Sequence, residues 1–231
     1  MLENWLRFWK GGEESGRGLG YFWSLCYDEF KMIFVNFKTY EQGTGEKAVK
    51  LAKICAEVEK ETSVKIIPIV QATGIPQIAN LGIEVWSQAE IAPGTTGVLL
   101  NHSDYKISIK KIENIIENLK FKIKNYRFLV CCESIEEGRE IAKFRPDFMA
   151  YEPPELIGGE ISVSNARPEI ISEFVQEIKE IPIIVGAGIH NQADVQKALE
   201  LGAKGILVSH AVVESDYPKS VLLELAKGFS K

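Results

Sequence analysis

Three side chains with complementary chemistry stand far apart in the sequence, each just after a short apolar run. They are Lys38, His102 and Glu152. A carboxylate can remove a proton from a carbon next to a carbonyl, an imidazole can polarise the carbonyl oxygen, and an ammonium can balance a substrate's negative charge. If the fold brings them together, these groups suit proton transfer on a small phosphorylated carbonyl compound.

Each of these residues also has an ordinary interpretation. A single lysine after a strand is commonly a solvated side chain, and a single histidine is commonly structural. Glu152 stands before two prolines and could be a loop residue, and His210 could simply occupy a loop. Placement of all three groups at the ends of expected strands is what favours the chemical interpretation.

From Met32 onward, short runs of β-branched and aromatic residues alternate with longer segments of helical period. Several runs are apolar at consecutive positions, as is typical of parallel strands buried on both faces. The expected strands are Ile33–Phe37, Lys65–Val70, Ile83–Ser87, Val98–Leu100, Arg127–Cys131, Asp147–Tyr151, Ile181–Val185 and Gly205–Val208.

The helical segments between these runs show apolar residues at three- and four-residue spacing. The expected helices are Glu46–Lys60, Ile75–Leu81, Ile107–Lys122, Ser134–Phe144, Pro168–Glu180, Gln192–Leu201 and Pro218–Lys227. Strands that alternate with helices indicate right-handed βαβ units and a parallel sheet. With eight strands, the sequence predicts an α/β protein of the TIM (β/α)8 barrel type with its helices outside.

One crossover is too short for a helix. Only Ala89–Thr96 separates the third and fourth expected strands, and eight extended residues span at most about 28 Å. The third outer helix is therefore expected to be missing, which would expose apolar barrel surface. The N-terminal segment is a candidate cover for that surface.

In such barrels the functional groups lie at the carboxyl ends of the strands. Asn36 and Lys38 follow the first strand, His102 the fourth and Glu152 the sixth. The seventh strand ends in Gly186-Ala187-Gly188 and the eighth in Ser209-His210-Ala211. Loops after these last two strands are the usual phosphate site, and a glycine lets backbone N–H groups approach an anion.

Four segments together resemble the triosephosphate isomerase family, in the short form typical of archaea and some bacteria. The resemblance covers Ile33 to about Phe229. The segments are Val35-Asn36-Phe37-Lys38-Thr39-Tyr40, Leu99-Leu100-Asn101-His102-Ser103, Tyr151-Glu152-Pro153-Pro154-Glu155-Leu156-Ile157-Gly158 and Val185-Gly186-Ala187-Gly188-Ile189.

The resemblance implies a reaction and a role for each residue. Glyceraldehyde 3-phosphate and dihydroxyacetone phosphate would be interconverted, in glycolysis and gluconeogenesis, with no metal or organic cofactor. Glu152 would be the base that transfers the proton, and His102 the neutral electrophile. Lys38 would be the electrostatic partner of the substrate, with the amide of Asn36 in support. The phosphate site, which includes a closing lid at about Pro153 to Ser162, would be formed by Ile157, Gly158, Gly188, Ser209 and His210.

The sequence departs from the family pattern at four places. The loop and helix between strands three and four, which help to join subunits in the family, are absent. Asp104 stands where many members carry Glu, the lid reads Ile157-Gly158-Gly159-Glu160, and His210 stands where small residues are more common. Two alternatives therefore stay open: a catalytically impaired relative that only binds phosphorylated ligands, and another phosphate-binding barrel such as an aldolase or a synthase of aromatic amino acids.

Length, net charge and cysteine content indicate where the protein works and which partners it has. The chain has 231 residues, a net charge of −5 and four cysteines without metal-ligand spacing. These values predict reduced thiols, a cytoplasmic location, and neither nucleic acid nor membrane as partner. We expect a homo-oligomer that acts on a small phosphorylated triose. Residues 1–31 do not match the rest, and they are either the product of a misassigned start, with Met32 as the true one, or an extension that docks on a barrel of residues 32–231.

Overall fold

The computed structural model describes residues 31–152 and 168–230, and these contain a closed barrel of eight parallel strands. Each strand pairs with the next, and the ladder from Met32↔Gly205 to Val35↔Val208 joins the last strand to the first. The strands are β1 Met32–Asn36, β2 Lys65–Val70, β3 Trp86–Gln88, β4 Gly97–Leu100, β5 Arg127–Cys132, β6 Phe148–Tyr151, β7 Ile183–Val185 and β8 Gly205–Val208. The predicted (β/α)8 architecture is confirmed.

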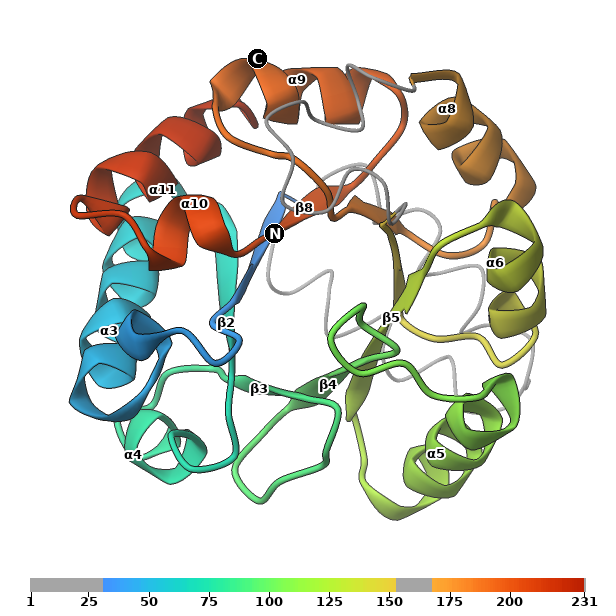
Figure 1. Cartoon of the computed structure of the whole chain (residues 1–231), viewed down its shortest axis with the longest axis horizontal. Helices are drawn as coiled ribbons and strands as arrows, with labels where there is room; N and C mark the ends of the chain where they lie inside the picture. Colours follow the sequence, from blue (N-terminus) through green and yellow to red (C-terminus); the bar gives the residue numbers. More distant parts are fainter. Residues whose placement is uncertain (1–30, 153–167, 231) are drawn as a thin grey trace, which may run out of the picture. The chain divides into compact units, whose positions relative to one another are not determined.

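The helices lie outside the strands, as Figure 1 shows. They are α3 Gly45–Thr62, α4 Ile75–Ala79, α5 Ile109–Lys122, α6 Ile135–Ala142, α8 Pro168–Glu177, α9 Gln192–Glu200, α10 His210–Val213 and α11 Pro218–Lys227, with a 3-10 turn η2 at Glu41–Gly43. Every predicted helix is present, with its ends moved by a few residues at most. Two short elements, α10 and η2, were not predicted, because a single turn is too short to show a hydrophobic period.

Alternate strand residues face inward, and aromatic rings fill the middle of the barrel. The ring centroid of Phe34 lies 5.1 Å from that of Trp86 and 5.5 Å from that of Phe148. These residues belong to β1, β3 and β6, which are not neighbours, so the rings meet through the barrel interior. A side chain at Gly97 would overlap the indole of Trp86, which explains the glycine at the start of β4.

The third predicted strand lies later in the chain than its sequence pattern indicated. Residues Ile83–Ser87 were expected, whereas β3 spans Trp86–Gln88. The ladder begins only at Ile69↔Trp86, because the stagger of the barrel places β3 against the end of β2. The pattern of β-branched residues in the sequence does not show at which residue the third strand begins to pair with β2.

The segment between β3 and β4 is a loop without a helix, as predicted. In Figure 1 the ring of helices is interrupted between α4 and α5, and this loop lies there. A Cβ at Gly94 would lie 3.3 Å from the Cβ of Ala79, so the loop packs against α4. The loop thereby covers part of the surface that the missing helix would have covered.

Tyr126 completes this cover from the side of β5. Its hydroxyl oxygen lies 3.1 Å from the carbonyl oxygen of Gly97 and 2.8 Å from Oγ1 of Thr95. Its ring packs edge-on against Phe128, with the centroids 5.7 Å apart. The start of β4 is therefore anchored by a buried aromatic residue, without the helix.

A carboxylate ties the amino-terminal ends of β2 to β5 together. Glu84 forms ion pairs with Lys65 and Arg127, and it accepts hydrogen bonds from Thr96 and from the indole of Trp86. Burial alone would raise the pKa of Glu84, but the two cations outweigh it and lower that pKa. Glu84 thus links the strands at the amino-terminal end of the barrel, beside the shortened crossover between β3 and β4.

Candidate active site

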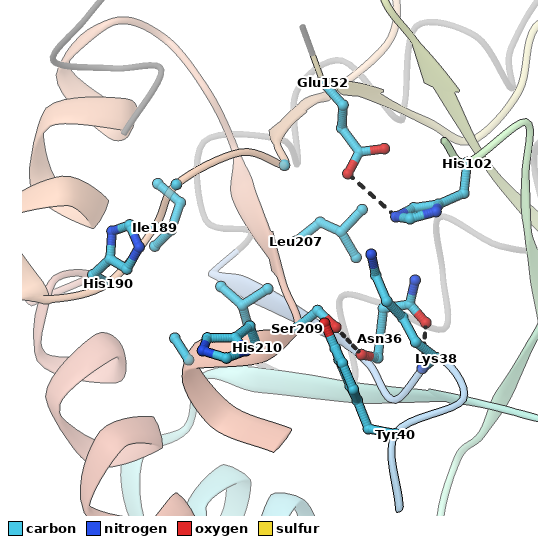
Figure 2. A pocket seen from close by; sticks show the side chains of 14 residues that line it. Asn36, Lys38, Tyr40, His102, Glu152, Ile189, His190, Leu207, Ser209 and His210 are labelled. Carbon is cyan, nitrogen blue, oxygen red and sulfur yellow. Dashed lines mark hydrogen bonds and ion pairs between the residues drawn. The ribbon is translucent and has the colours of Figure 1, made fainter. Parts of the chain in front are cut away.

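One pocket opens at the carboxyl ends of the strands, and most of the predicted site residues line it (Figure 2). Ile157 and Gly158 lie outside the described residues. The predicted residues that line the pocket are Asn36, Lys38, His102, Glu152, Gly188, Ser209 and His210. The structure therefore brings an ammonium, an imidazole and a carboxylate from three separate strand ends to one place.

Lys38 is held in an unusual backbone conformation directly after β1. Its φ of 48° is in the left-handed region, which is unfavourable for a residue with a side chain. Its N–H donates to Oδ1 of Asn36 at 3.1 Å, and its carbonyl accepts from Nε2 of Gln71 at 2.9 Å. These two bonds hold the strained turn that directs the lysine into the pocket.

Asp104 contacts the lysine in spite of its short side chain. Oδ1 of Asp104 lies 3.3 Å from Nζ of Lys38. The carboxylate is partly exposed, so solvent weakens the pair. An aspartate at this position is therefore long enough to restrain the ammonium group.

The imidazole of His102 is neutral and its proton can be placed. The backbone N–H of Asp104 donates to Nδ1 at 3.1 Å, so Nδ1 must be the acceptor and Nε2 must carry the hydrogen. The Asp104 carboxylate also lies 3.4 Å from Nδ1, but the carboxylate and the unprotonated Nδ1 are both acceptors and form no hydrogen bond with each other. Burial, reinforced by the charge of Lys38, lowers the pKa of His102 to about 4.

Asn101 fixes the backbone from which His102 projects. Its φ of 58° turns the chain at the end of β4. Its Nδ2 donates to the carbonyl of Cys131 at 2.9 Å and to Oε1 of Glu137 at 2.8 Å, and its Oδ1 accepts from the N–H of Ile107 at 3.1 Å. These bonds connect the turn to β5 and α6, so the direction of His102 does not depend on the loop before β4.

Glu152 faces His102 from the end of β6. Its Oε1 lies 3.6 Å from Nε2 of His102, and each of these residues is only 3% exposed. Burial raises the pKa of Glu152 to about 7, although Lys38 and the Cys131 thiol oppose the shift. A carboxylate that titrates near neutrality can both accept and return a proton.

The space beside this carboxylate is kept by a glycine. A Cβ placed at Gly186 would lie 2.6 Å from Cγ of Glu152 and 3.0 Å from its Oε1. Carbon atoms not bonded to each other prefer about 3.5–4.0 Å. The position of the Glu152 carboxylate therefore requires the absence of a side chain at residue 186.

Two buried polar atoms of the pocket have no partner among the residues that the structure describes. They are Nδ2 of Asn36 and Oε2 of Glu152. Oγ of Ser209 donates to the carbonyl of Asn36 at 2.7 Å, which joins β8 to β1 but leaves the amide nitrogen unused. One donor and one acceptor are thus left for a polar ligand.

Half of the residues that line the pocket were not among the predicted site residues. They are Tyr40, Gly186, Ile189, His190, Leu207, Val208 and Ala211. Tyr40, Gly186, Ile189 and Ala211 stand in segments that the sequence singled out for the site, but no role was assigned to them. Leu207 could have been found from the in–out alternation along β8, and His190 from its place two residues after Gly188.

Three further observations concern metal-binding groups, cysteines and long apolar helices. No group of three or more His, Cys, Asp or Glu residues is placed there to hold a metal ion. Cys55, Cys131 and Cys132 are free thiols, and burial raises the pKa of all three, whereas Cys26 lies outside the described part. No helix in the described ranges is long and apolar enough to cross a membrane.

The chain is similar in sequence to proteins of one family. A family model described as triosephosphate isomerase matches residues 84–227. The triosephosphate isomerase of Thermoplasma volcanium is 37% identical over 217 residues, which cover 84% of this chain and 99% of that protein. The triosephosphate isomerase of Methanothermus fervidus is 36% identical over 217 residues, which cover 84% of this chain and 96% of that protein.

Solved structures with low identity share the fold. Thiamine phosphate pyrophosphorylase from Pyrococcus furiosus is 17% identical with a TM-score of 0.61, and the match covers 87% of this chain and 96% of that one. N-acetylmannosamine-6-phosphate 2-epimerase from Clostridium perfringens is 16% identical with a TM-score of 0.59, over 80% of this chain and 89% of that one. At such identities the likeness extends to the barrel alone.

Proposed function

Because this chain belongs to the triosephosphate isomerase family, we propose that it interconverts D-glyceraldehyde 3-phosphate and dihydroxyacetone phosphate. The observation that carries the proposal is the arrangement of Glu152 and His102. A buried carboxylate with a pKa of about 7 lies 3.6 Å from the Nε2 of a neutral imidazole, in a pocket that Lys38 also lines. The substrate is a small phosphorylated triose.

Glu152 is the proposed base. It would take the proton from the carbon next to the carbonyl, and the electron pair of the C–H bond would pass to the carbonyl oxygen to give an enediol-type intermediate. The same carboxyl group would then return a proton to the neighbouring carbon. The reaction begins and ends at the same oxidation level, so no oxidant or reductant takes part.

His102 is the proposed electrophile. Its hydrogen is on Nε2, the ring nitrogen that faces Glu152, so a substrate oxygen between the two residues could accept it. A neutral imidazole can donate this hydrogen bond and later exchange the proton between the two substrate oxygens. The low pKa of His102, about 4, favours the neutral form throughout the physiological range.

Lys38 is the proposed counter-charge for the substrate, and Asn36 supports the same region. The backbone at Gly188, Ser209 and His210 would bind the phosphoryl group. As the resemblance implies, Ile157 and Gly158 would belong to a lid that closes over this group and excludes water. No cofactor is required, because the substrate's own carbonyl stabilises the negative charge that forms.

A coupled isomerase assay tests the proposal. Glu152→Asp and His102→Gln should each lower kcat by about 10²–10⁴-fold, since each displaces or removes a group that moves a proton. Purified wild-type protein that is well folded but gives no turnover with either triose phosphate would refute the proposal. If such a protein still bound inorganic phosphate, the impaired, ligand-binding alternative would be favoured.

The cellular setting is part of the same proposal. We expect a cytoplasmic homo-oligomer in glycolysis and gluconeogenesis, with residues 32–231 as the catalytic domain. Expression of Met32–Lys231 beside the full chain tests the role of residues 1–31. Loss of solubility in the shorter form would indicate that the segment covers apolar barrel surface, whereas equal behaviour would favour a misassigned start.

A further inference from the structure

Two histidines line the pocket whose side chains have no part in the proposed chemistry. Figure 2 shows His190 and His210 on the side opposite His102 and Glu152. Among the described residues that line the pocket, Lys38 is the single lysine or arginine. Of the described residues, those that can supply side-chain positive charge at this end of the pocket are therefore the histidines.

His210 is held in place by a carboxylate one helical turn away. Its Nδ1 lies 2.6 Å from Oε2 of Glu214, and its ring packs edge-on against Tyr40 with the centroids 6.3 Å apart. A carboxylate accepts hydrogen bonds only, so Nδ1 carries a hydrogen and Nε2 is the ring nitrogen left for a ligand. Nε2 forms no hydrogen bond within the described ranges, and the side chain is 74% exposed.

His190 is less firmly held. Its backbone N–H donates to Oδ2 of Asp194 at 3.0 Å, whereas its ring Nδ1 lies 3.8 Å from the same oxygen. That distance is beyond a normal hydrogen bond, so the carboxylate positions the loop more than the ring. The two histidines thus form a matched pair, of which one imidazole is oriented by a carboxylate.

We propose that His210, oriented by Glu214, is a side-chain ligand of the substrate's phosphoryl group and makes the affinity for dianions dependent on protonation. The inference rests on the proposed function for the identity of the substrate. In its protonated form the ring donates from Nε2 to a phosphoryl oxygen while Nδ1 donates to Glu214. A charge-assisted hydrogen bond from an imidazolium to a dianion is stronger than a bond between neutral groups.

Sulfate is the probe that separates this effect from titration of the ligand. Phosphate changes its own charge near pH 6, whereas sulfate is a dianion throughout. Other groups that line the pocket also titrate, and ionisation of Glu152 near pH 7 should weaken anion binding as well. Inhibition by sulfate is therefore measured for wild type and for His210→Asn from about pH 6 to pH 8.5, and the difference isolates His210.

At the low-pH end, His210→Asn should raise the inhibition constant of sulfate and the KM for triose phosphate about five-fold. At the high-pH end the two proteins should converge. The change in kcat should stay within about two-fold, because His210 contacts the non-reacting end of the substrate. Equal inhibition constants in the two proteins at low pH would overturn the proposal.

Two further variants test the role of Glu214. Glu214→Gln keeps an acceptor for Nδ1 but removes the charge, so its effect on KM should be intermediate. His190→Asn is the matched control and should change KM by less than His210→Asn does. An effect of His190→Asn as large as that of His210→Asn would show that orientation by Glu214 is irrelevant.

An NMR titration needs no catalytic turnover, so it tests the role of His210 independently of the isomerase reaction. The ring nitrogens of His210 are followed by NMR during a pH titration of the wild-type protein, with and without sulfate. Sulfate should shift the midpoint of the His210 titration upward, and an unchanged midpoint would refute ligation. Absence of isomerase activity would instead refute the proposed function while this titration still decided the role of His210.

Discussion

The closest steric constraint on the proposed base comes from Gly186, and Gly186→Ala tests it. The added Cβ would lie 2.6 Å from Cγ of Glu152, whereas a normal carbon–carbon contact needs about 3.5 Å. Gly186 does not have a positive φ, so alanine fits its backbone and the effect is purely steric. The side chain of Glu152 must therefore move by about 1 Å.

A displacement of this size is large for proton transfer. Misplacing a reacting group by about 1 Å can cost about 10²-fold in rate, so kcat for Gly186→Ala should fall by roughly that factor. KM should change much less, because the phosphate site is not touched. Steady-state kinetics in both directions give the two constants, and a thermal melt reports whether the fold is kept.

Gly74→Ala is the matched control for this variant. A Cβ at Gly74 meets no atom closer than 3.6 Å, and its φ is −89°. This variant should keep wild-type kcat. If Gly186→Ala is folded and its kcat is within about three-fold of wild type, the reasoning that residue 186 fixes Glu152 is wrong.

Three further predictions follow from buried polar groups. Glu152→Gln should raise the free energy of unfolding at high pH by up to about 3 kcal/mol, because the folded-state pKa of about 7 is above the usual value of 4.5. The protonated carboxyl stabilises the fold below pH 4.5 and that stability is lost as pH rises through 7, so the gain measured by urea unfolding should disappear in acid. Tyr126→Phe should lower stability by about 1–2 kcal/mol in the same assay and leave kcat unchanged. Asn101→Ala should destabilise the protein by about 1–3 kcal/mol and also lower kcat, whereas a variant with unchanged kcat would show that His102 is positioned by other contacts.

The elements could be predicted from sequence because their cause is local. The apolar face of α3 shows the helical period directly, because its buried residues Ala48, Leu51, Ala52, Cys55 and Val58 recur at three- and four-residue spacing. Gly202 follows Leu201, the C-cap of α9, and has a φ of 99°, as is typical of the left-handed glycine that ends a helix. The absence of a third outer helix followed from chain length alone.

Features that depend on distant contacts could not be predicted. Nothing in the sequence near Glu84 indicates that it joins Lys65 and Arg127, and nothing near Gly186 shows that its neighbour in space is Glu152. The hydrogen bond from the backbone of Asp104 to His102 depends on a turn whose geometry is set by Asn101. Glu84 and its two cations, and Gly186 and Glu152, become neighbours only in the closed barrel.

The loop at residues 89–96 shows how little of a crossover a barrel needs. One end of β4 is anchored by Tyr126, and the other end is locked to β5 and α6 by Asn101. Strand β4 is therefore held at both ends by contacts that lie outside this loop. Since the entropy of closing a loop grows only slowly with its length, residues could be inserted or removed between β3 and β4 with little effect on the chemistry. This stretch of the barrel is thus open to evolutionary variation in length, while the opposite end of the same strand is not.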